Sequence, residues 1–168
     1  MASIGLFYGS TTGDTLKVAE LIQEEFGSEN VDLIDVANAS ADDLKNYDAL
    51  ILGTSTWHWG GLQDEWAIFQ DNLTQEALQG KPVALFGVGD QKSYGNNFVD
   101  GLGLLYDKVK PMVGKVVGRW PKDGYSYNAS AAEEGGSLVG LALDQDNQSD
   151  QTPTRVRAWV QQLRKELA

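Results

Sequence analysis

Short, β-prone apolar runs alternate with segments of helical periodicity along the chain. Runs of this kind, bounded by polar residues and glycine, are typical of buried strands. The predicted strands are Ile4–Tyr8, Val31–Asp35, Ala49–Gly53, Val83–Gly87, and Lys115–Val117 with a continuation near Leu138–Leu143. Strands separated by helical segments are the pattern of repeated βαβ units.

Between these runs, apolar residues recur at helical spacing, which predicts helices that each bury one face. The four stripes are Val18, Leu21, Ile22 and Phe26; Trp66, Phe69 and Leu73; Phe98, Leu102, Leu105 and Val109; and Val156, Trp159, Val160, Leu163 and Leu167. The last helix is expected to have Thr152 as its N-cap and Pro153 in its first turn, and a weaker helix is expected over residues 40–46. Five parallel strands with helices on both faces make a doubly wound α/β sheet.

Composition narrows the range of chemistry. A chain of 168 residues that is 42% hydrophobic fits a single domain over residues 1–168. The absence of cysteine excludes disulfides, iron–sulfur ligation and thiol nucleophiles, and a single histidine gives no reason to expect a metal site. Any redox chemistry must therefore belong to a bound cofactor.

Charge and targeting signals narrow the range of partners. The chain passes from Met1 directly into the first predicted strand and has no apolar run of membrane-spanning length, so we expect a cytoplasmic protein without membrane insertion, with the monomer as default. A formal charge of −11 argues against nucleic acid and favours basic protein partners met by electrostatic steering. Simple solubility is the alternative reading of this charge.

The segment Gly9–Thr15 follows the first strand and opens the first helix. Glycine and hydroxyl residues at such a junction aim unpaired backbone N–H groups and the positive end of the helix dipole at one point, which suits a phosphate. The Walker pattern fails because Asp14 stands where its lysine would be. The segment therefore suits a terminal monophosphate that is held without reacting, and a well-capped helix start is the alternative.

Two further loops at the carboxyl edge of the sheet carry aromatic residues. Residues 54–61 follow the third strand and contain Trp57 and Trp59, and residues 88–97 follow the fourth strand and contain Tyr94. Exposed rings of this kind predict a flat ligand stacked between them, each contact adding roughly 0.5–1.5 kcal/mol beyond area burial. The alternative is that either tryptophan folds back onto the sheet.

Together these features make the sequence resemble a long-chain flavodoxin of the kind found in cyanobacteria and other bacteria. The resemblance covers essentially the whole chain and is carried by Ile4–Gly13, Thr56–Trp57, Phe86–Gln91 with Tyr94 and Asn97–Phe98, and Val139–Gln148. It implies a flavodoxin-like three-layer α/β/α fold with a five-stranded parallel sheet of order 2-1-3-4-5. Residues 120–137 match the long insertion that splits the fifth strand in this group.

Flavodoxins bind FMN without a covalent bond and carry single electrons at low potential, so the resemblance implies an electron-transfer protein that is not an enzyme. Residues 10–15 would surround the phosphate, Trp57 and Tyr94 would sandwich the isoalloxazine ring, and groups near Asp90, Asn97 and Asp146 would meet the rest of the cofactor. The implied cofactor-binding residues are Gly9, Ser10, Thr11, Thr12, Gly13, Asp14, Thr15, Thr54, Ser55, Thr56, Trp57, His58, Trp59, Gly60, Gly89, Asp90, Tyr94, Asn97 and Asp146.

Such a site disfavours an anionic reduced flavin, because Lys92 is the only basic side chain in the three loops. One fixed negative charge about 8 Å away costs roughly 2 kcal/mol at an effective dielectric near 20, on the order of 90 mV. We therefore expect cycling mainly between the semiquinone and the hydroquinone. The peptide that turns over on reduction in the family falls at His58–Trp59, where non-glycine residues predict weaker semiquinone stabilisation.

An acidic ring is expected around the flavin edge, facing redox proteins with basic docking patches such as a ferredoxin–NADP reductase, photosystem I or a nitrogenase reductase. Its members are Asp64, Glu65, Asp100, Asp144, Asp146 and Asp150. An FMN-dependent quinone or NAD(P)H oxidoreductase on the same fold is the alternative function, although no G-x-G-x-x-G fingerprint is present. A phospho-acceptor receiver is disfavoured because Tyr8-Gly9 and Gly53-Thr54 stand where it needs acidic residues.

Overall fold

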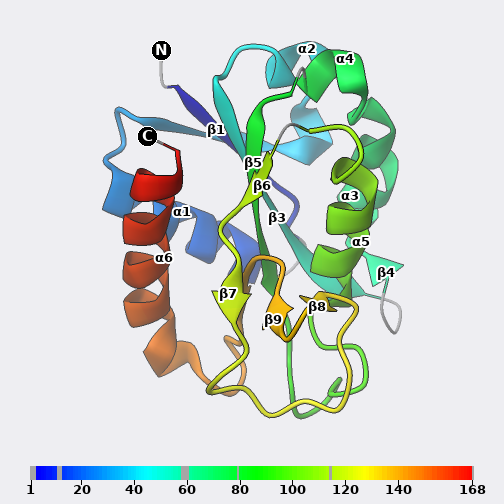
Figure 1. The fold of residues 1–168 in the computed structure, drawn as a ribbon, viewed down its shortest axis with the longest axis vertical. Coiled ribbons are helices and arrows are strands. Elements are labelled where there is room, and N and C mark those ends of the chain that lie inside the picture. The colour runs from blue at the N-terminus through cyan, green and yellow to red at the C-terminus, as the bar shows by residue number, and fades with distance from the viewer. Residues whose placement is uncertain (1–2, 11–12, 58–60, 79, 114, 168) are drawn as a thin grey trace.

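The computed structural model describes residues 3–10, 13–57, 61–78, 80–113 and 115–167. Helices lie on both faces of a central sheet whose main strands run parallel (Figure 1). These strands are β1 (Ile4–Tyr8), β2 (Val31–Asp35), β3 (Ala49–Trp57), β5 (Pro82–Val88), β6 (Lys115–Val117) and β10 (Leu141–Leu143). The order β2-β1-β3-β5, with β6 and β10 beyond β5, confirms the doubly wound α/β/α fold.

The fifth position of the sheet is shared by two short strands. β6 pairs with Pro82–Ala84 and β10 pairs with Phe86–Val88, so both lie parallel to β5, one after the other. Residues 118–140 run between them and form a small antiparallel sheet of order β7-β9-β8, made of β7 (Trp120–Pro121), β8 (Glu133–Glu134) and β9 (Ser137–Leu138). The predicted split is confirmed, but the prediction that its second half starts near Leu138 is wrong.

The helices are α1 (Asp14–Phe26), α2 (Ala41–Leu44), α3 (Asp64–Phe69), α4 (Gln75–Leu78), α5 (Asp100–Val109) and α6 (Thr152–Glu166), with 3-10 turns η1 (Val36–Asn38), η2 (Gln70–Asn72) and η3 (Ser149–Gln151). α1 and α6 lie side by side on one face of the sheet, and α3 and α5 cover the other (Figure 1). Thr152 is the first residue of α6, and its hydroxyl donates to the side chain of Gln145. The predicted N-cap is therefore wrong, because Gln151 occupies that position.

Two apolar cores lie on the two faces of the sheet, and alternate strand residues fill them. In β3, Ile51 packs with α1 and α6, whereas Leu50 and Leu52 pack with α3 and α5. All four predicted helical stripes contribute buried residues, and burying each large apolar side chain stabilises the fold by roughly 1.5–3 kcal/mol. No helix in the described part of the chain has both the length and the apolar composition needed to cross a lipid bilayer.

The raised pKa of the buried Tyr47 leads us to expect a loss of stability at alkaline pH. Its ring is buried against Phe7, and its hydroxyl donates to Asp32 over 3.0 Å. Burial, followed by the hydrogen bond and charge of Asp32, raises the pKa of Tyr47 to about 12. An unfolded tyrosine titrates near pH 10, so between about pH 10 and 12 the unfolded chain loses this proton while the folded chain keeps it. The free energy of unfolding should therefore fall as pH rises through that window.

Tyr47→Phe is expected to make this alkaline loss shallower than in the wild type, as measured by urea denaturation at pH 9 and pH 11. Some loss should persist, because burial also raises the pKa of Tyr125 to about 12. Equal losses in the two proteins would show that Tyr47 does not carry the effect.

Candidate functional site

The segment after β1 presents backbone donors at the start of α1. Ser10 Oγ accepts hydrogen bonds from the N–H groups of Gly13 (3.0 Å) and Leu16 (3.4 Å). Among the described residues, no acceptor is assigned to the N–H groups of Asp14 and Thr15. Gly13 has φ +96°, and no atom of the described residues lies within 4 Å of an ideal Cβ there. The predicted residues Thr11 and Thr12 lie outside the described residues. This geometry is that of an anion-binding helix start.

The backbone behind this segment is tightly packed. The Gly53 carbonyl, in β3, accepts the indole N–H of Trp66 over 2.6 Å and the N–H of Gly9 over 3.3 Å. A Cβ at Gly9 would overlap the amide oxygen of Gln63 and lie 2.9 Å from the Trp66 ring. Gln63 is itself the N-cap of α3 and accepts the backbone N–H of Trp66. The start of α3 therefore fixes the position of the chain after β1.

The residues predicted to follow the third strand lie largely within it. β3 continues to Trp57 and pairs there with β4 (Gly61–Leu62), an antiparallel strand that the sequence did not predict. Residues 54–57, which were expected to form a loop, therefore belong to β3. Thr54 is fully buried, and Thr56 Oγ1 accepts the N–H of Gly101 at the start of α5 over 2.8 Å. The side chain of Trp57 and residues His58, Trp59 and Gly60 lie outside the described residues.

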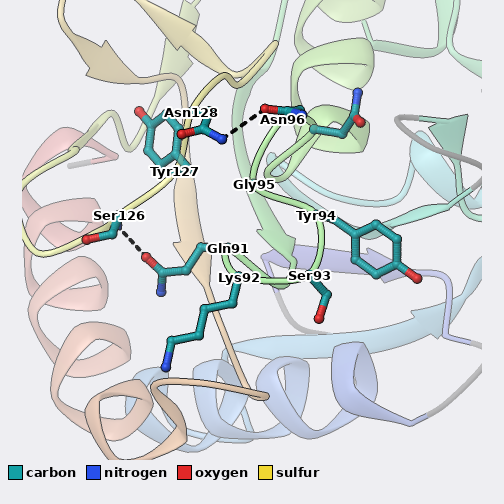
Figure 2. A pocket seen from close by; sticks show the side chains of 10 residues that line it. Gln91, Lys92, Ser93, Tyr94, Gly95, Asn96, Ser126, Tyr127 and Asn128 are labelled. Atoms are coloured by element: carbon teal, nitrogen blue, oxygen red, sulfur yellow. Dashed lines mark hydrogen bonds between the residues drawn. The ribbon is translucent and has the colours of Figure 1, made fainter.

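A tight turn after β5 carries Tyr94. Asp90 Oδ1 accepts the N–H groups of Lys92 (3.1 Å) and Ser93 (2.9 Å), and the Asp90 carbonyl accepts that of Tyr94. Burial alone would raise the pKa of Asp90, but hydrogen bonds from Ser93, Lys92 and the side chain of Asn147 bring it below its ordinary value. The Tyr94 ring is 47% exposed and points away from the insertion (Figure 2). The turn thus presents an aromatic ring at the sheet edge.

Backbone strain follows this turn. Val99 has φ +48°, which is unusual for a β-branched residue and costs of the order of 1–3 kcal/mol. The Val99 side chain is fully buried and packs against Gly89. A Cβ at Gly89 would lie only 3.0 Å from Val99 Cγ1. Asn97 is half-buried, and its amide donates to Asp100 Oδ2 over 2.9 Å. Close packing therefore holds the connection between the Tyr94 turn and α5.

The segments after β1, β5 and β10 lie at one edge of the sheet, because β1 pairs parallel to β3, β3 to β5, and β5 to β10. The predicted residues Asp14, Asp90 and Asp146 come from these three segments. Partial desolvation of its carboxylate, followed by the negative charges of Asp90, Asp14 and Asp144, raises the pKa of Asp146. Asp144 differs from the sequence expectation of a surface charge, because its side chain is fully buried.

The insertion packs against the Tyr94 turn, which sequence reasoning missed. The Gly95 carbonyl accepts the N–H groups of Asn128 (2.7 Å) and Ala129 (3.0 Å), and the Asn128 amide donates to Asn96 Oδ1. A cavity of about 220 Å³ lies between the two segments, lined by residues 91–97 and 126–128 (Figure 2). The insertion is rich in Gly, Tyr and Ser, a composition that by itself indicates only a surface loop.

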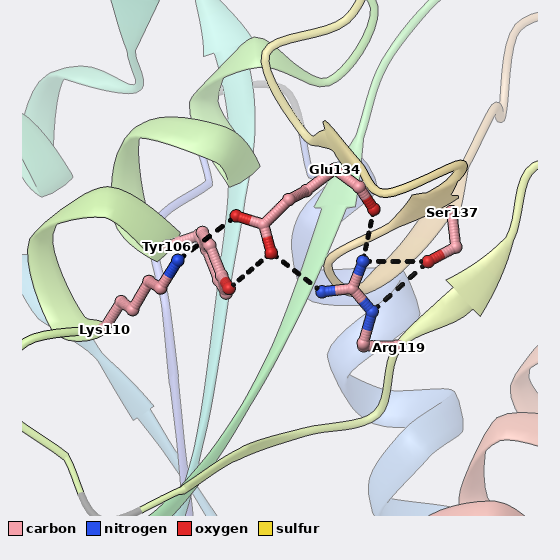
Figure 3. A network of polar contacts seen from close by, with 5 residues as sticks. All are labelled: Tyr106, Lys110, Arg119, Glu134 and Ser137. Atoms are coloured by element: carbon pink, nitrogen blue, oxygen red, sulfur yellow. Dashed lines mark hydrogen bonds and ion pairs between the residues drawn. The ribbon is translucent and has the colours of Figure 1, made fainter.

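A polar cluster fixes the far side of the insertion to α5 (Figure 3). Glu134 Oε1 accepts the hydroxyl of Tyr106 and pairs with Arg119, while Oε2 pairs with Lys110 at 3.3 Å. Arg119 also donates to the hydroxyl of Ser137. This cluster is exposed, so its ion pairs contribute little stability individually. Its consequence is geometric, because it ties β8 to α5.

The sequence model of the flavodoxin family matches residues 6–159. The chain belongs to the flavodoxin family. It is 50% identical to the flavodoxin of Synechococcus elongatus over 168 residues, covering 99% of each chain. It is 42% identical to flavodoxin 1 of Escherichia coli, covering 99% of this chain and 96% of that one.

Solved structures agree with this membership. The crystal structure of the Fusobacterium nucleatum flavodoxin bound to flavin mononucleotide superposes with a TM-score of 0.92 at 34% identity, and the match covers 100% of both chains. The alignments cover nearly the whole of the cyanobacterial relatives, and an insertion divides the fifth strand of the sheet. These two findings identify the chain as a flavodoxin of the long-chain type.

Proposed function

We propose that this flavodoxin binds FMN without a covalent bond and carries single electrons between redox proteins. The observation that supports it most is the convergence of the start of α1, which offers two N–H donors to an anion, with the exposed Tyr94 ring at the same sheet edge. A phosphate and a flat ring at opposite ends of one ligand fit these two features. The Fusobacterium nucleatum flavodoxin, 34% identical, was crystallised with FMN.

Five described residues of the proposed site have a physical part that follows from the geometry. The N–H groups of Asp14 and Thr15 would hold the phosphate while Ser10 keeps the turn closed. Tyr94 would stack on the ring, and Asp90 would shape the turn that presents it. The proposed set remains Gly9, Ser10, Thr11, Thr12, Gly13, Asp14, Thr15, Thr54, Ser55, Thr56, Trp57, His58, Trp59, Gly60, Gly89, Asp90, Tyr94, Asn97 and Asp146.

FMN supplies the one-electron chemistry, and the protein sets its potential. Asp14, Asp90 and Asp146 surround the site with negative charge, and the chain as a whole carries −11. Negative charge opposes the addition of an electron, so the residues of this site favour a low potential. Flavodoxins transfer electrons and do not turn over a substrate, so the enzymatic alternative is not favoured.

Titration of the apoprotein with FMN and with riboflavin tests the phosphate site. FMN should bind about a hundredfold more tightly, because two charge-assisted hydrogen bonds to the phosphate are lost in riboflavin. Quenching of flavin fluorescence measures both constants. Equal affinities would contradict the assignment of the α1 start, and no binding of either flavin would contradict the proposed function.

The proposed docking partners are redox proteins that carry basic surface patches. The chain is proposed to act as a monomer in the cytoplasm. Asp64, Asp146 and Asp150 are exposed, whereas Asp144 is buried and Asp100 is engaged with Asn97 and Ala131. The acidic ring is therefore smaller than the sequence predicted. Electron transfer to a basic reductase should slow as salt increases in stopped-flow measurements, and a rate that rises steadily with salt would contradict steering.

A further inference from the structure

Asp144 is a buried carboxylate immediately after β10. Its side chain is 0% exposed, and no ion pair with a lysine or arginine joins it among the described residues. A buried negative charge is costly unless hydrogen bonds replace its water. The carboxylate must therefore be held by neutral donors, and those donors show what it does.

Three residues supply the donors, and Gln91 and Asn147 supply most of them. Gln91 gives its backbone N–H (3.1 Å) and its side-chain amide (2.8 Å) to Oδ2. Asn147 gives its backbone N–H to Oδ1 (2.9 Å), and its side-chain amide contacts both oxygens. The backbone N–H of Asp146 also reaches Oδ1 over 3.2 Å. One carboxylate thus joins the segment after β5 to the segment after β10.

Asn147 and Gln91, which donate to Asp144, also contact the Tyr94 turn and the insertion. The Asn147 amide also donates to Asp90 Oδ1 over 2.8 Å, the oxygen that accepts the N–H groups opening the turn. Gln91 follows Asp90, and its side-chain oxygen accepts the N–H of Ser126 in the insertion (Figure 2). Asp144 is therefore linked through Asn147 to the turn at Asp90 and through Gln91 to the insertion.

We propose that Asp144 is a positioning residue of the FMN site, whose buried carboxylate, shared by Gln91 and Asn147, holds the turn at Asp90 so that Tyr94 stands at the site edge. The inference rests on the proposed FMN-binding function. It assigns Asp144 no contact with the cofactor. Because its charge is buried and its Oδ1 accepts the backbone N–H of Asp146, it also adds to the negative potential of the site.

Two variants break the link from its two ends. Asp144→Asn keeps the shape but removes the charge and turns one acceptor into a donor facing Gln91 or Asn147. Gln91→Met keeps the Asp144 charge but removes the side-chain donor and acceptor of Gln91. Both should weaken FMN binding by about tenfold, the equivalent of one charge-assisted hydrogen bond, and speed amide hydrogen exchange at residues 92–94 of the apoprotein.

The reduction potential separates positioning from simple stability. The second one-electron potential of bound flavin should rise in Asp144→Asn beyond its value in Asp123→Asn, an exposed control that removes the same charge. In Gln91→Met it should stay near wild type. Wild-type FMN dissociation in Gln91→Met, or an unshifted potential in Asp144→Asn, overturns the proposal. If Asp144→Asn fails to fold, FMN dissociation in Gln91→Met decides. Failure of the wild type to bind FMN would contradict the proposed function instead.

Discussion

Trp66→Ala is expected to lower the free energy of unfolding by about 3–5 kcal/mol, the range for deleting a buried aromatic side chain. Trp66 is fully buried, meets Phe69 edge to face at 5.6 Å, and donates its indole N–H to the Gly53 carbonyl over 2.6 Å. The variant loses this packing and leaves a cavity at the start of α3. Urea denaturation of the apoprotein measures the change.

Trp66→Phe and Trp159→Phe form a matched pair that locates the functional part of this effect. Trp159 is also fully buried and donates its indole N–H, over 2.8 Å, to the Gly118 carbonyl on the opposite face of the sheet. Each variant loses one buried hydrogen bond, so each should be destabilised by about 1–3 kcal/mol. Only Trp66→Phe should also weaken FMN binding, because the Gly53 carbonyl anchors Gly9 as well. Equal FMN affinities would contradict that link.

Gly140→Ala is expected to cost about 3 kcal/mol, at the upper end for overpacking. A Cβ at this position would overlap the carbonyl oxygen of Leu85 and lie 2.8 Å from its carbonyl carbon. Those atoms belong to β5, which β3 holds on one side and β6 holds on the other, so the displacement must fall on β10. Thermal and urea unfolding should both report the loss, and FMN binding should weaken because Asp144 follows β10.

Gly136→Ala is the control for this substitution. Gly136 has φ +83°, and within the described part of the chain no atom lies within 4 Å of an ideal Cβ, so alanine there meets strain of about 1–2 kcal/mol but no clash with a described residue. If Gly140→Ala costs no more than Gly136→Ala, the contact with Leu85 is not the cause.

Long periodic segments were predictable, because burial on both faces of a parallel sheet leaves a strong pattern. The bounds of β1 and β2 match the predicted strands, and the third helical stripe coincides with α5 apart from Phe98, which precedes it. The second stripe was predicted as one helix, yet it divides into α3, η2 and the non-helical Leu73 while all three of its residues stay buried. Periodicity therefore reports burial more faithfully than helix length.

Features set by distant contacts were not predictable. β4 is too short to show a period. Thr152 is not the N-cap because the 3-10 turn η3 leads directly into α6, which leaves Gln151 at that position. Asp144 looked like a surface charge because its partner Gln91 lies 53 positions away in the chain. No local pattern encodes such a pairing. Gln91 and Asp144 become partners only because β5 and β10, the strands that precede them, pair in the sheet.

The division of the fifth strand sets the order in which the segments of the proposed site can form during synthesis on the ribosome. β1, β3 and β5 all precede residue 89, so the sheet edge can assemble early, whereas Asp144 and Asn147 emerge only after the whole insertion has been synthesised. A nascent chain halted before β10 would carry the Tyr94 turn without the partners that brace it. Retention of the prosthetic group should therefore be a late event in biosynthesis, delayed until β10 and the segment after it have been synthesised.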